Sequence, residues 1–376
     1  MAEQSPFIFG KLANQGHFVN RDEEKRMLRL NLESGINTIL ISPRRWGKSS
    51  LVKEVGQLSA KQEKFKWCFI DMFAIRNEKE LYETLAKEVL RQTATKSEDI
   101  LRSAGQFFKT LIPKFSYTVD PVQDLSVSLD WDELKKSPSD VLNLAEKIAV
   151  KKKVRIIICI DEFQQLTSFD KKNTIEKMLR SHWQHHQHVS YCLYGSKRHM
   201  MTEIFERKPN AFYRFGQIFF LQKIAKQHWI PYILSTYKKH RITISEAMAN
   251  DIVDAMQEHP YYVQQLCFML WTMAEKTIDK KLIQKAIERI ITLNEPVFQH
   301  EFDSMSNTQV SMLKALVNGE VMLSSQNIIN KYNLGSSRLI IKNKNTLIND
   351  DIIMLHNKKF EFIDPVFALW LKQIFA

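Results

Sequence analysis

The chain has 376 residues, of which 44% are hydrophobic, 26% charged and 11% aromatic, and this composition excludes a single small module and a disordered protein. Its 54 Lys and Arg against 42 Asp and Glu give a net charge of +12, which favours a polyanionic partner: a nucleotide, a nucleic acid or an anionic surface. The cysteines are widely spaced, which predicts buried reduced thiols: Cys68, Cys159, Cys192 and Cys267. Without a signal-like N-terminus or a membrane-length apolar run, we expect a cytoplasmic protein with no membrane partner.

The first part of the chain alternates between strand and helix patterns. Asn20 begins a possible capping box with Glu23 for a helix that ends at Glu33, and a strand at 37–41 then leads through a loop into a helix at 51–58. Further strands are predicted at 65–71, 154–160, 189–194 and 217–221, and further helices at 78–92, 141–150 and 173–186. This alternation predicts an α/β fold with a parallel sheet of about five strands sandwiched by helices.

One segment inside this part is harder to interpret. Residues 93–137 mix an amphipathic piece at 100–112 with the strand-like sequences FSYTV and LSVSLDW. We treat them as an insertion of uncertain shape within a core domain that covers residues 1–222.

The last part of the chain predicts two smaller domains. Residues 223–301 contain only helical patterns, which we expect to be broken at Pro231, at His259-Pro260 and at Pro296, and they predict an all-α lid. Residues 302–376 begin with helices at 308–317, 325–332 and 336–347 and continue with a hairpin around Asn357-Lys358. Three helices followed by a hairpin predict a winged-helix domain.

The sequence SPRRWGKS at 42–49 matches the phosphate-binding loop pattern G-x-x-x-x-G-K-[ST] at every fixed position except the first, where Ser42 replaces Gly. The pattern wraps backbone N–H groups around phosphates at a helix N-terminus, brings Lys48 to the β and γ oxygens, and places the Ser49 hydroxyl on Mg²⁺. A chance G-K-S on a surface loop is the alternative, and the strand before and helix after disfavour it. The residues expected to bind ATP are Ser42, Pro43, Arg44, Arg45, Trp46, Gly47, Lys48, Ser49 and Ser50.

Polar residues follow two of the predicted strands. Asp161 and Glu162 end the apolar run IIICI, and the carboxyl ends of strands are where open α/β sheets bind ligands. We expect Asp161 to hold Mg²⁺ and Glu162 to orient or deprotonate the attacking water, although both could instead cap a helix. Ser196 ends the next strand and could touch the γ-phosphate or that water, although Gly-Ser after a strand is usually a turn.

The order of several short sequences resembles the archaeal-type ATPase family, within the STAND and AAA+ group of P-loop ATPases. These are FVNRDE, PRRWGKSSL, IDEFQ, LYGS, FYRFG, HPYYVQ and DPVFALW, and they extend from Phe18 to Trp370. The resemblance implies a sheet core, a helical lid and a C-terminal winged helix. It also implies that residues beside the adenine are Phe18, Val19, Asn20 and Arg21, and that Ser196 is the first sensor.

The resemblance also implies an arginine that reaches the nucleotide of a neighbouring subunit in a homo-oligomer. Arg214 in FYRFG is the candidate, Arg198 is a weaker one, and an arginine bonded to its own sheet or to solvent is an equally good interpretation. The lid has His259-Pro260 where many relatives carry a second-sensor arginine, so we expect no cationic contact from the lid and slow turnover.

Two further groups of residues have more than one interpretation. The helix expected at 336–347 contains Arg338, Lys342 and Lys344 without an acidic residue, which would suit phosphate contacts to DNA, but many winged helices bind a client protein instead. The histidines at the end of the helix at 173–186 and just beyond it lack acidic or cysteine neighbours in the sequence, which favours a solvated helix terminus over a metal site: His182, His185, His186 and His188.

Our hypothesis from the sequence is therefore an Mg²⁺-dependent ATPase whose nucleotide state moves the lid and the winged helix. The alternatives are a nucleotide-gated DNA-binding regulator and a protein-interaction scaffold, both with little hydrolysis.

Overall fold

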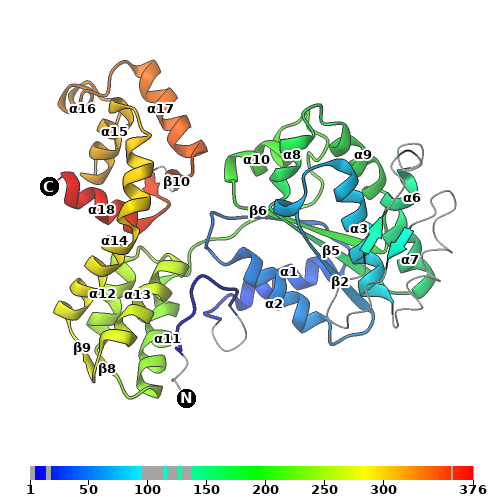
Figure 1. Ribbon diagram of the computed structural model, residues 1–376, viewed down its shortest axis with the longest axis horizontal. Coiled ribbons are helices and arrows are strands. Elements are labelled where there is room, and N and C mark those ends of the chain that lie inside the picture. Colours follow the sequence, from blue (N-terminus) through cyan, green and yellow to red (C-terminus); the bar gives the residue numbers. More distant parts are fainter. Residues whose placement is uncertain are drawn as a thin grey trace. The chain divides into compact units, whose positions relative to one another are not determined.

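The computed structural model describes residues 5–13, 18–94, 114–116, 126–128, 132, 138–356 and 359–375 (Figure 1). The chain forms two compact units. Residues 21–44 and 48–221 make up one, called the sheet unit below, and residues 1–20, 45–47 and 222–376 make up the other, called the C-terminal unit. Among the described residues, no helix is both long and apolar enough to cross a membrane.

A five-stranded parallel sheet forms the centre of the sheet unit. Its strands are β1 (Thr38–Ile41), β2 (Phe65–Asp71), β5 (Arg155–Asp161), β6 (Val189–Gly195) and β7 (Gln217–Phe220). Their spatial order is β2-β5-β6-β1-β7, so β6 lies between β1 and β5. All of β1 and β6 and the middle of β5 are buried, which explains the unbroken apolar run in β5 and the largely apolar sequences of β1 and β6. The predicted parallel sheet is confirmed.

Helices cover both faces of this sheet, as β2 shows. A Cβ atom added to Gly56 in α2 (Lys48–Ser59) would lie 2.6 Å from the ring of Phe69. The adjacent residue Cys68 points the other way, where its thiol contacts the carbonyl of Glu88 in α3 (Glu78–Thr93) at 3.9 Å. Because side chains alternate along a strand, α2 and α3 lie on opposite faces (Figure 1). All four cysteines are buried and free, which confirms that prediction.

The other elements of the sheet unit include the helices expected near 22–33, 141–150 and 173–186, together with helices at 72–74, 163–165, 166–169 and 198–206, which the sequence patterns did not predict. They are α1 (Asp22–Glu33), η2 (Met72–Ala74), α6 (Ser139–Leu142), α7 (Leu144–Lys152), η3 (Phe163–Gln165), α8 (Leu166–Phe169), α9 (Thr174–Trp183) and α10 (Arg198–Glu206). The expected capping box at Asn20 is wrong, because the N-cap of α1 is Arg21, in a left-handed conformation with a φ of 74°. The helix expected at 141–150 is two helices, separated at Asn143.

The insertion at 93–137 is described only in part. β3 (Lys114–Ser116) and β4 (Ser126–Ser128) pair as an antiparallel ribbon within the sequences FSYTV and LSVSLDW. The amphipathic piece expected at 100–112 lies outside the described residues.

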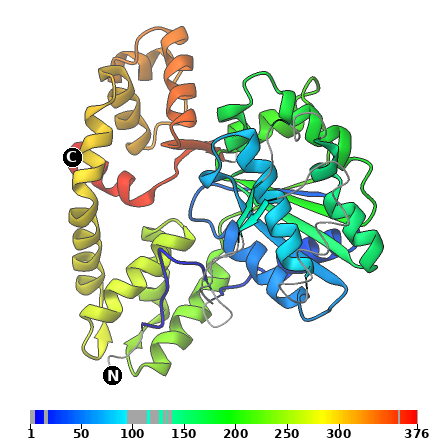
Figure 2. The same cartoon turned by 45° about the vertical axis from the view of Figure 1, so that its right-hand side comes forward.

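The C-terminal unit begins with a helical part that corrects one expectation. Its elements are α11 (Lys226–Lys239), β8 (Thr243–Ile244), α12 (Glu246–Ala255), α13 (Pro260–Met273), β9 (Thr277–Ile278) and α14 (Lys280–Asp303). Pro260 starts a helix as expected, but Pro231 and Pro296 lie inside α11 and α14 and do not break them. Burial of an apolar stripe on each helix outweighs the hydrogen bond that a proline removes. Figure 2 shows α14 as one long helix, in yellow.

The unit ends in a winged helix. Its elements are α15 (Asn307–Val317), α16 (Gln326–Tyr332), α17 (Ser337–Asn349), β10 (Ile353–His356), β11 (Lys359–Phe362) and α18 (Pro365–Phe375). The strands β10 and β11 pair as the expected antiparallel hairpin. The ring of Phe298 in α14 packs edge-on against Phe367 and at a tilt against Trp370 of α18, so the last helix shares a core with the lid. The boundary expected at 301/302 falls inside α14.

Candidate active site

The loop from Ser42 to Gly47 connects β1 to the N-terminus of α2. Gly47 has a φ of +93°, and a Cβ atom added there would meet nothing within 4 Å, so the backbone conformation rather than space calls for glycine. Ser42 does not have a positive φ and is 1% exposed. Serine therefore fits the first position of the pattern without strain.

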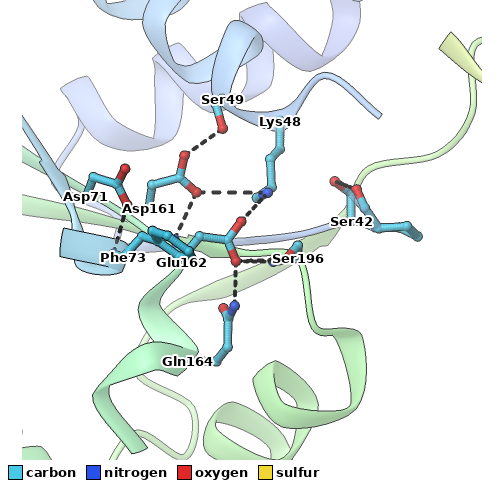
Figure 3. A network of polar contacts seen from close by, with 10 residues as sticks. Ser42, Lys48, Ser49, Asp71, Phe73, Asp161, Glu162, Gln164 and Ser196 are labelled. Atoms are coloured by element: carbon cyan, nitrogen blue, oxygen red, sulfur yellow. Dashed lines mark hydrogen bonds and ion pairs between the residues drawn. The ribbon is translucent and has the colours of Figure 1, made fainter. Parts of the chain in front are cut away.

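Four side chains from two distant segments of the chain converge at the carboxyl edge of the sheet (Figure 3). Lys48 and Ser49 begin α2, where the loop ends. The Ser49 hydroxyl donates to Asp161 Oδ2 at 2.6 Å, and the Lys48 ammonium lies 2.8 Å from Glu162 Oε1 and 3.9 Å from Asp161 Oδ1. Asp161 is the last residue of β5, and Glu162 follows it with a φ of 49°. This left-handed residue turns the chain at the strand end, next to the start of α2.

The other oxygen of Glu162 has partners from two further places. Ser196, 2% exposed at the end of β6, donates its hydroxyl to Glu162 Oε2 at 2.7 Å and its backbone N–H at 3.3 Å. The amide of Gln164 donates to the same oxygen at 2.5 Å. Sequence reasoning missed Gln164. The signal for it was an amide two residues after Glu162, within reach of that carboxylate.

These contacts set the charges of the two carboxylates. Burial would raise the pKa of Glu162, but the charge of Lys48 and hydrogen bonds from Lys48, Ser196 and Gln164 outweigh burial and lower it to about 2. Burial raises the pKa of Asp161, and Lys48 and Ser49 only partly oppose that increase. Glu162 is therefore a carboxylate at neutral pH, as a group that orients water must be.

The donor set also suits a magnesium ion. A hydroxyl oxygen and a carboxylate oxygen meet at Ser49 and Asp161, and Mg²⁺ commonly takes one or two protein oxygens and completes its shell with waters and phosphates. Across the described part of the chain, no group of three or more His, Cys, Asp or Glu side chains is placed to hold a metal ion. His182 and His186 each contact the side-chain oxygen of Asn143 at 3.2 Å.

The remaining residues of the loop are less directly engaged in this cluster. Arg44 is exposed and Trp46 is buried. Arg45 is grouped with the C-terminal unit, where its guanidinium donates to the Tyr262 hydroxyl at 3.0 Å and lies 4.6 Å from the centre of the Tyr261 ring. The lid residue His259 is buried, and burial, Lys223 and Arg45 lower its pKa to about 3, so it is neutral at pH 7.

The residues expected beside the adenine do not belong to a single unit. Phe18, Val19 and Asn20 belong to the C-terminal unit, in whose core Val19 is buried. Arg21 belongs to the sheet unit, where it forms an ion pair with Glu24 at 2.7 Å. Their role beside adenine stays a prediction.

The two candidates for an intersubunit arginine lie on the sheet unit. Arg214 is exposed, with a φ of 53°, and its guanidinium lies 5.2 Å from the centre of the Tyr213 ring. Arg198 is also exposed and lies 5.0 Å from the centre of the Phe220 ring. Neither position tests a contact with a second subunit.

Comparisons with known proteins agree with this geometry. Residues 18–230 match the model of a family described as an ATPase domain predominantly from Archaea, and residues 296–373 match a probable winged helix domain. The Walker-type ATPase PABY2304 of Pyrococcus abyssi is similar over 96% of this chain and 97% of its own, with a TM-score of 0.67 and 16% identity. The ORC2 protein of Aeropyrum pernix, solved as ADPNP–ADP complexes, is similar over 99% and 98%, with a TM-score of 0.58 and 15% identity. A search of curated proteins found no match.

Proposed function

Since this chain belongs to the family of ATPase domains found predominantly in Archaea, we propose that it binds ATP with Mg²⁺ and hydrolyses it at the carboxyl edge of its sheet. One observation carries the proposal: Lys48, Ser49, Asp161, Glu162 and Ser196 come from three segments of the chain and lie within direct contact of one another. A chance G-K-S on a surface loop would not place a buried lysine against a carboxylate pair.

Each of these side chains has a role that its position supports. Lys48 exchanges Glu162 for the β and γ phosphate oxygens, and Ser49 and Asp161 would hold Mg²⁺, which would supply positive charge against the phosphates. Glu162 accepts a proton from a water whose oxygen bonds to the γ-phosphorus. The bond from that phosphorus to the bridging oxygen breaks, and ADP leaves with the electron pair. Ser196 keeps Glu162 in place and contacts the γ-phosphate or the water.

ATP turnover by wild type and two variants tests this proposal. We expect Lys48→Ala to lose nucleotide binding and turnover, and Glu162→Gln to bind ATP without hydrolysing it. Lys53→Ala is the matched control, because Lys53 is an exposed lysine on the same helix. Equal turnover by all four proteins would exclude hydrolysis at this site.

Arg214 supports an extension to a homo-oligomer. If its guanidinium acts on the nucleotide of a neighbouring subunit, Lys48→Ala and Arg214→Ala are each inactive alone but restore part of the activity when mixed. In a mixed oligomer, some interfaces combine an intact Lys48 loop on one subunit with an intact Arg214 on its neighbour, and these interfaces would be active. Mixing without any rescue would place Arg214 outside a shared site.

A second candidate function rests on α17. Its exposed side includes Arg338 and Lys342, and no Asp or Glu occurs between Ser337 and Asn349. This helix therefore suits contacts with DNA phosphates, and nucleotide state would act through movement of the lid and the winged helix. The test is DNA titration with ATP, ADP or neither, comparing wild type with Arg338→Ala/Lys342→Ala and with the exposed control Lys372→Ala. Absence of low-salt binding in every state would exclude DNA and favour a client protein.

A further inference from the structure

The two oxygens of Glu162 have different kinds of partners. Among the described residues, the hydrogen-bond partner of Oε1 is the ammonium of Lys48 at 2.8 Å, which in the proposed function moves to the phosphates. Oε2 accepts hydrogen bonds from the hydroxyl and backbone N–H of Ser196 and from the amide of Gln164. Figure 3 shows Lys48 on one side of this carboxylate and Gln164 with Ser196 on the other. One oxygen is therefore anchored and the other is released.

The Gln164 amide bonds Glu162 through its N–H₂ group, while its own oxygen is left without a partner in the part of the chain that the structure describes. Its side chain is 1% exposed, and its Oε1 is buried without a hydrogen-bond partner among the described residues. A buried acceptor without a partner destabilises the fold, and an apolar side chain of similar size would avoid that cost. The opposite orientation of the amide would set two oxygens against each other, so the N–H₂ group faces Glu162. What the amide provides is its hydrogen bond to that carboxylate.

The end of β6 leaves room for this amide. A Cβ atom on Gly195 would lie 2.0 Å from Gln164 Oε1 and 2.7 Å from the sulfur of Met201. Gly195 does not have a positive φ, so its backbone conformation would accept any residue. Glycine is therefore needed at position 195 because a side chain there would occupy the space of the Gln164 amide.

We propose that Gln164 is a positioning residue that, together with Ser196, fixes Oε2 of Glu162 and so aims Oε1 at the attacking water. Once the phosphates take the Lys48 ammonium, Oε1 is the free oxygen and accepts the proton of the water, while Oε2 stays bonded. Without Gln164 the carboxylate keeps the hydroxyl and the N–H of Ser196 but loses the third donor to Oε2, so it is held less firmly and can rotate. The inference rests on the proposed function and deepens it.

Gln164→Met tests this role, since methionine has a similar size and no N–H group. We expect kcat to fall by about 10- to 100-fold, the loss of one hydrogen bond to a charged group, while KM for ATP and Kd for ADP stay within about twofold. The matched control is Gln165→Met, because Gln165 bonds Glu162 through its backbone N–H, at 2.8 Å, and not through its side chain. A thermal melt of each variant accompanies the kinetics.

Gly195→Ala tests the same contact from the other side. We expect it to lower kcat about as much as Gln164→Met, because the new methyl displaces the amide. In a Gln164→Ala background the amide is gone and the methyl meets the flexible end of Met201, which can shift, so Gly195→Ala should have little further effect on kcat. Additive losses in the double variant would overturn the inference.

The outcomes separate this inference from the proposed function. Wild-type turnover that Gln164→Met leaves unchanged would overturn the inference alone. A loss in which kcat, KM and melting temperature change together would show that Gln164 supports only the fold, and would also overturn it. A wild-type protein without turnover would overturn the proposed function, and the positioning role with it.

Discussion

The ion pair between Lys48 and Glu162 predicts that removing the Glu162 carboxylate strengthens nucleotide binding. Lys48 must leave Glu162 Oε1, 2.8 Å away, before it can reach phosphate oxygens. The Glu162→Gln substitution removes the charge that holds the ammonium but keeps the shape of the side chain. We therefore expect the variant to bind ADP more tightly than wild type while it loses ATP turnover.

The distances set the size of this effect. At an effective dielectric constant of about 20, two unit charges 2.8 Å apart attract each other by about 6 kcal/mol. Asp161 Oδ1 remains 3.9 Å from the ammonium in the variant, and solvation of the freed lysine offsets much of the loss. A hydrogen bond between charged groups has a net value of about 1.5–3 kcal/mol. The expected gain in ADP affinity is therefore about 10- to 100-fold.

Calorimetric titration with ADP and Mg²⁺ measures this gain without the complication of hydrolysis. Removing any negative charge near the site also favours an anionic ligand, so the control must remove one that does not bind Lys48. Asp71→Asn is this control. Asp71 lies beside Asp161 in the strand register at the same sheet edge, and its carboxylate accepts a hydrogen bond from the backbone N–H of Phe73. If Glu162→Gln gains no more affinity than Asp71→Asn, competition between Glu162 and phosphate for Lys48 is refuted.

The remaining predictions concern the stability of the fold. A Cβ atom on Gly216 would lie 2.2 Å from the carbonyl oxygen of Asn37, so Gly216→Ala should lower the free energy of unfolding in urea by about 3 kcal/mol; a change under about 0.5 kcal/mol would contradict the steric argument. Burial and two nearby carboxylates raise the pKa of Glu176 from 4.5 to about 7, so its contribution to stability is complete below pH 4.5 and is lost as pH rises through 7. Glu176→Gln stays neutral, so at about pH 8 its free energy of unfolding should exceed that of wild type by about 1 kcal/mol, after allowance for solvent screening. At about pH 5 the difference should be smaller or reversed. A difference that does not change with pH would refute the assignment. The buried hydroxyl of Tyr237 donates to the carbonyl of Cys267 at 2.7 Å, so Tyr237→Phe should cost about 1 kcal/mol in the same urea assay, and an unchanged midpoint would count against that bond.

Local chemistry explains what could be predicted about the site. The Gly47-Lys48-Ser49 sequence, flanked by a strand and a helix, indicates a phosphate loop without any knowledge of distant residues. The acidic pair after the IIICI run is equally local, because a buried parallel strand reads as an unbroken apolar stretch. These patterns are enough to predict the sheet and, at its edge, the candidate phosphate loop and the acidic pair.

Local patterns failed where tertiary packing decides the conformation. The prolines inside α11 and α14 predicted breaks in these helices. Each helix nevertheless continues past its proline, because burial of its apolar stripe stabilises the helical conformation. The capping box expected at Asn20 did not form, because Arg21 takes the N-cap position and pairs with Glu24. Propensity is a weak signal against such contacts.

The sequence by itself determined the order of elements that makes a parallel sheet, and it predicted the phosphate loop and the carboxylate pair. Only the tertiary structure decided that β6 separates β1 from β5, that Lys48 lies against Glu162, and that Gln164 occupies the space above Gly195. The physical reason is range: a strand or loop signal lies in adjacent residues, whereas contacts between residues tens to more than a hundred positions apart depend on how the whole sheet folds.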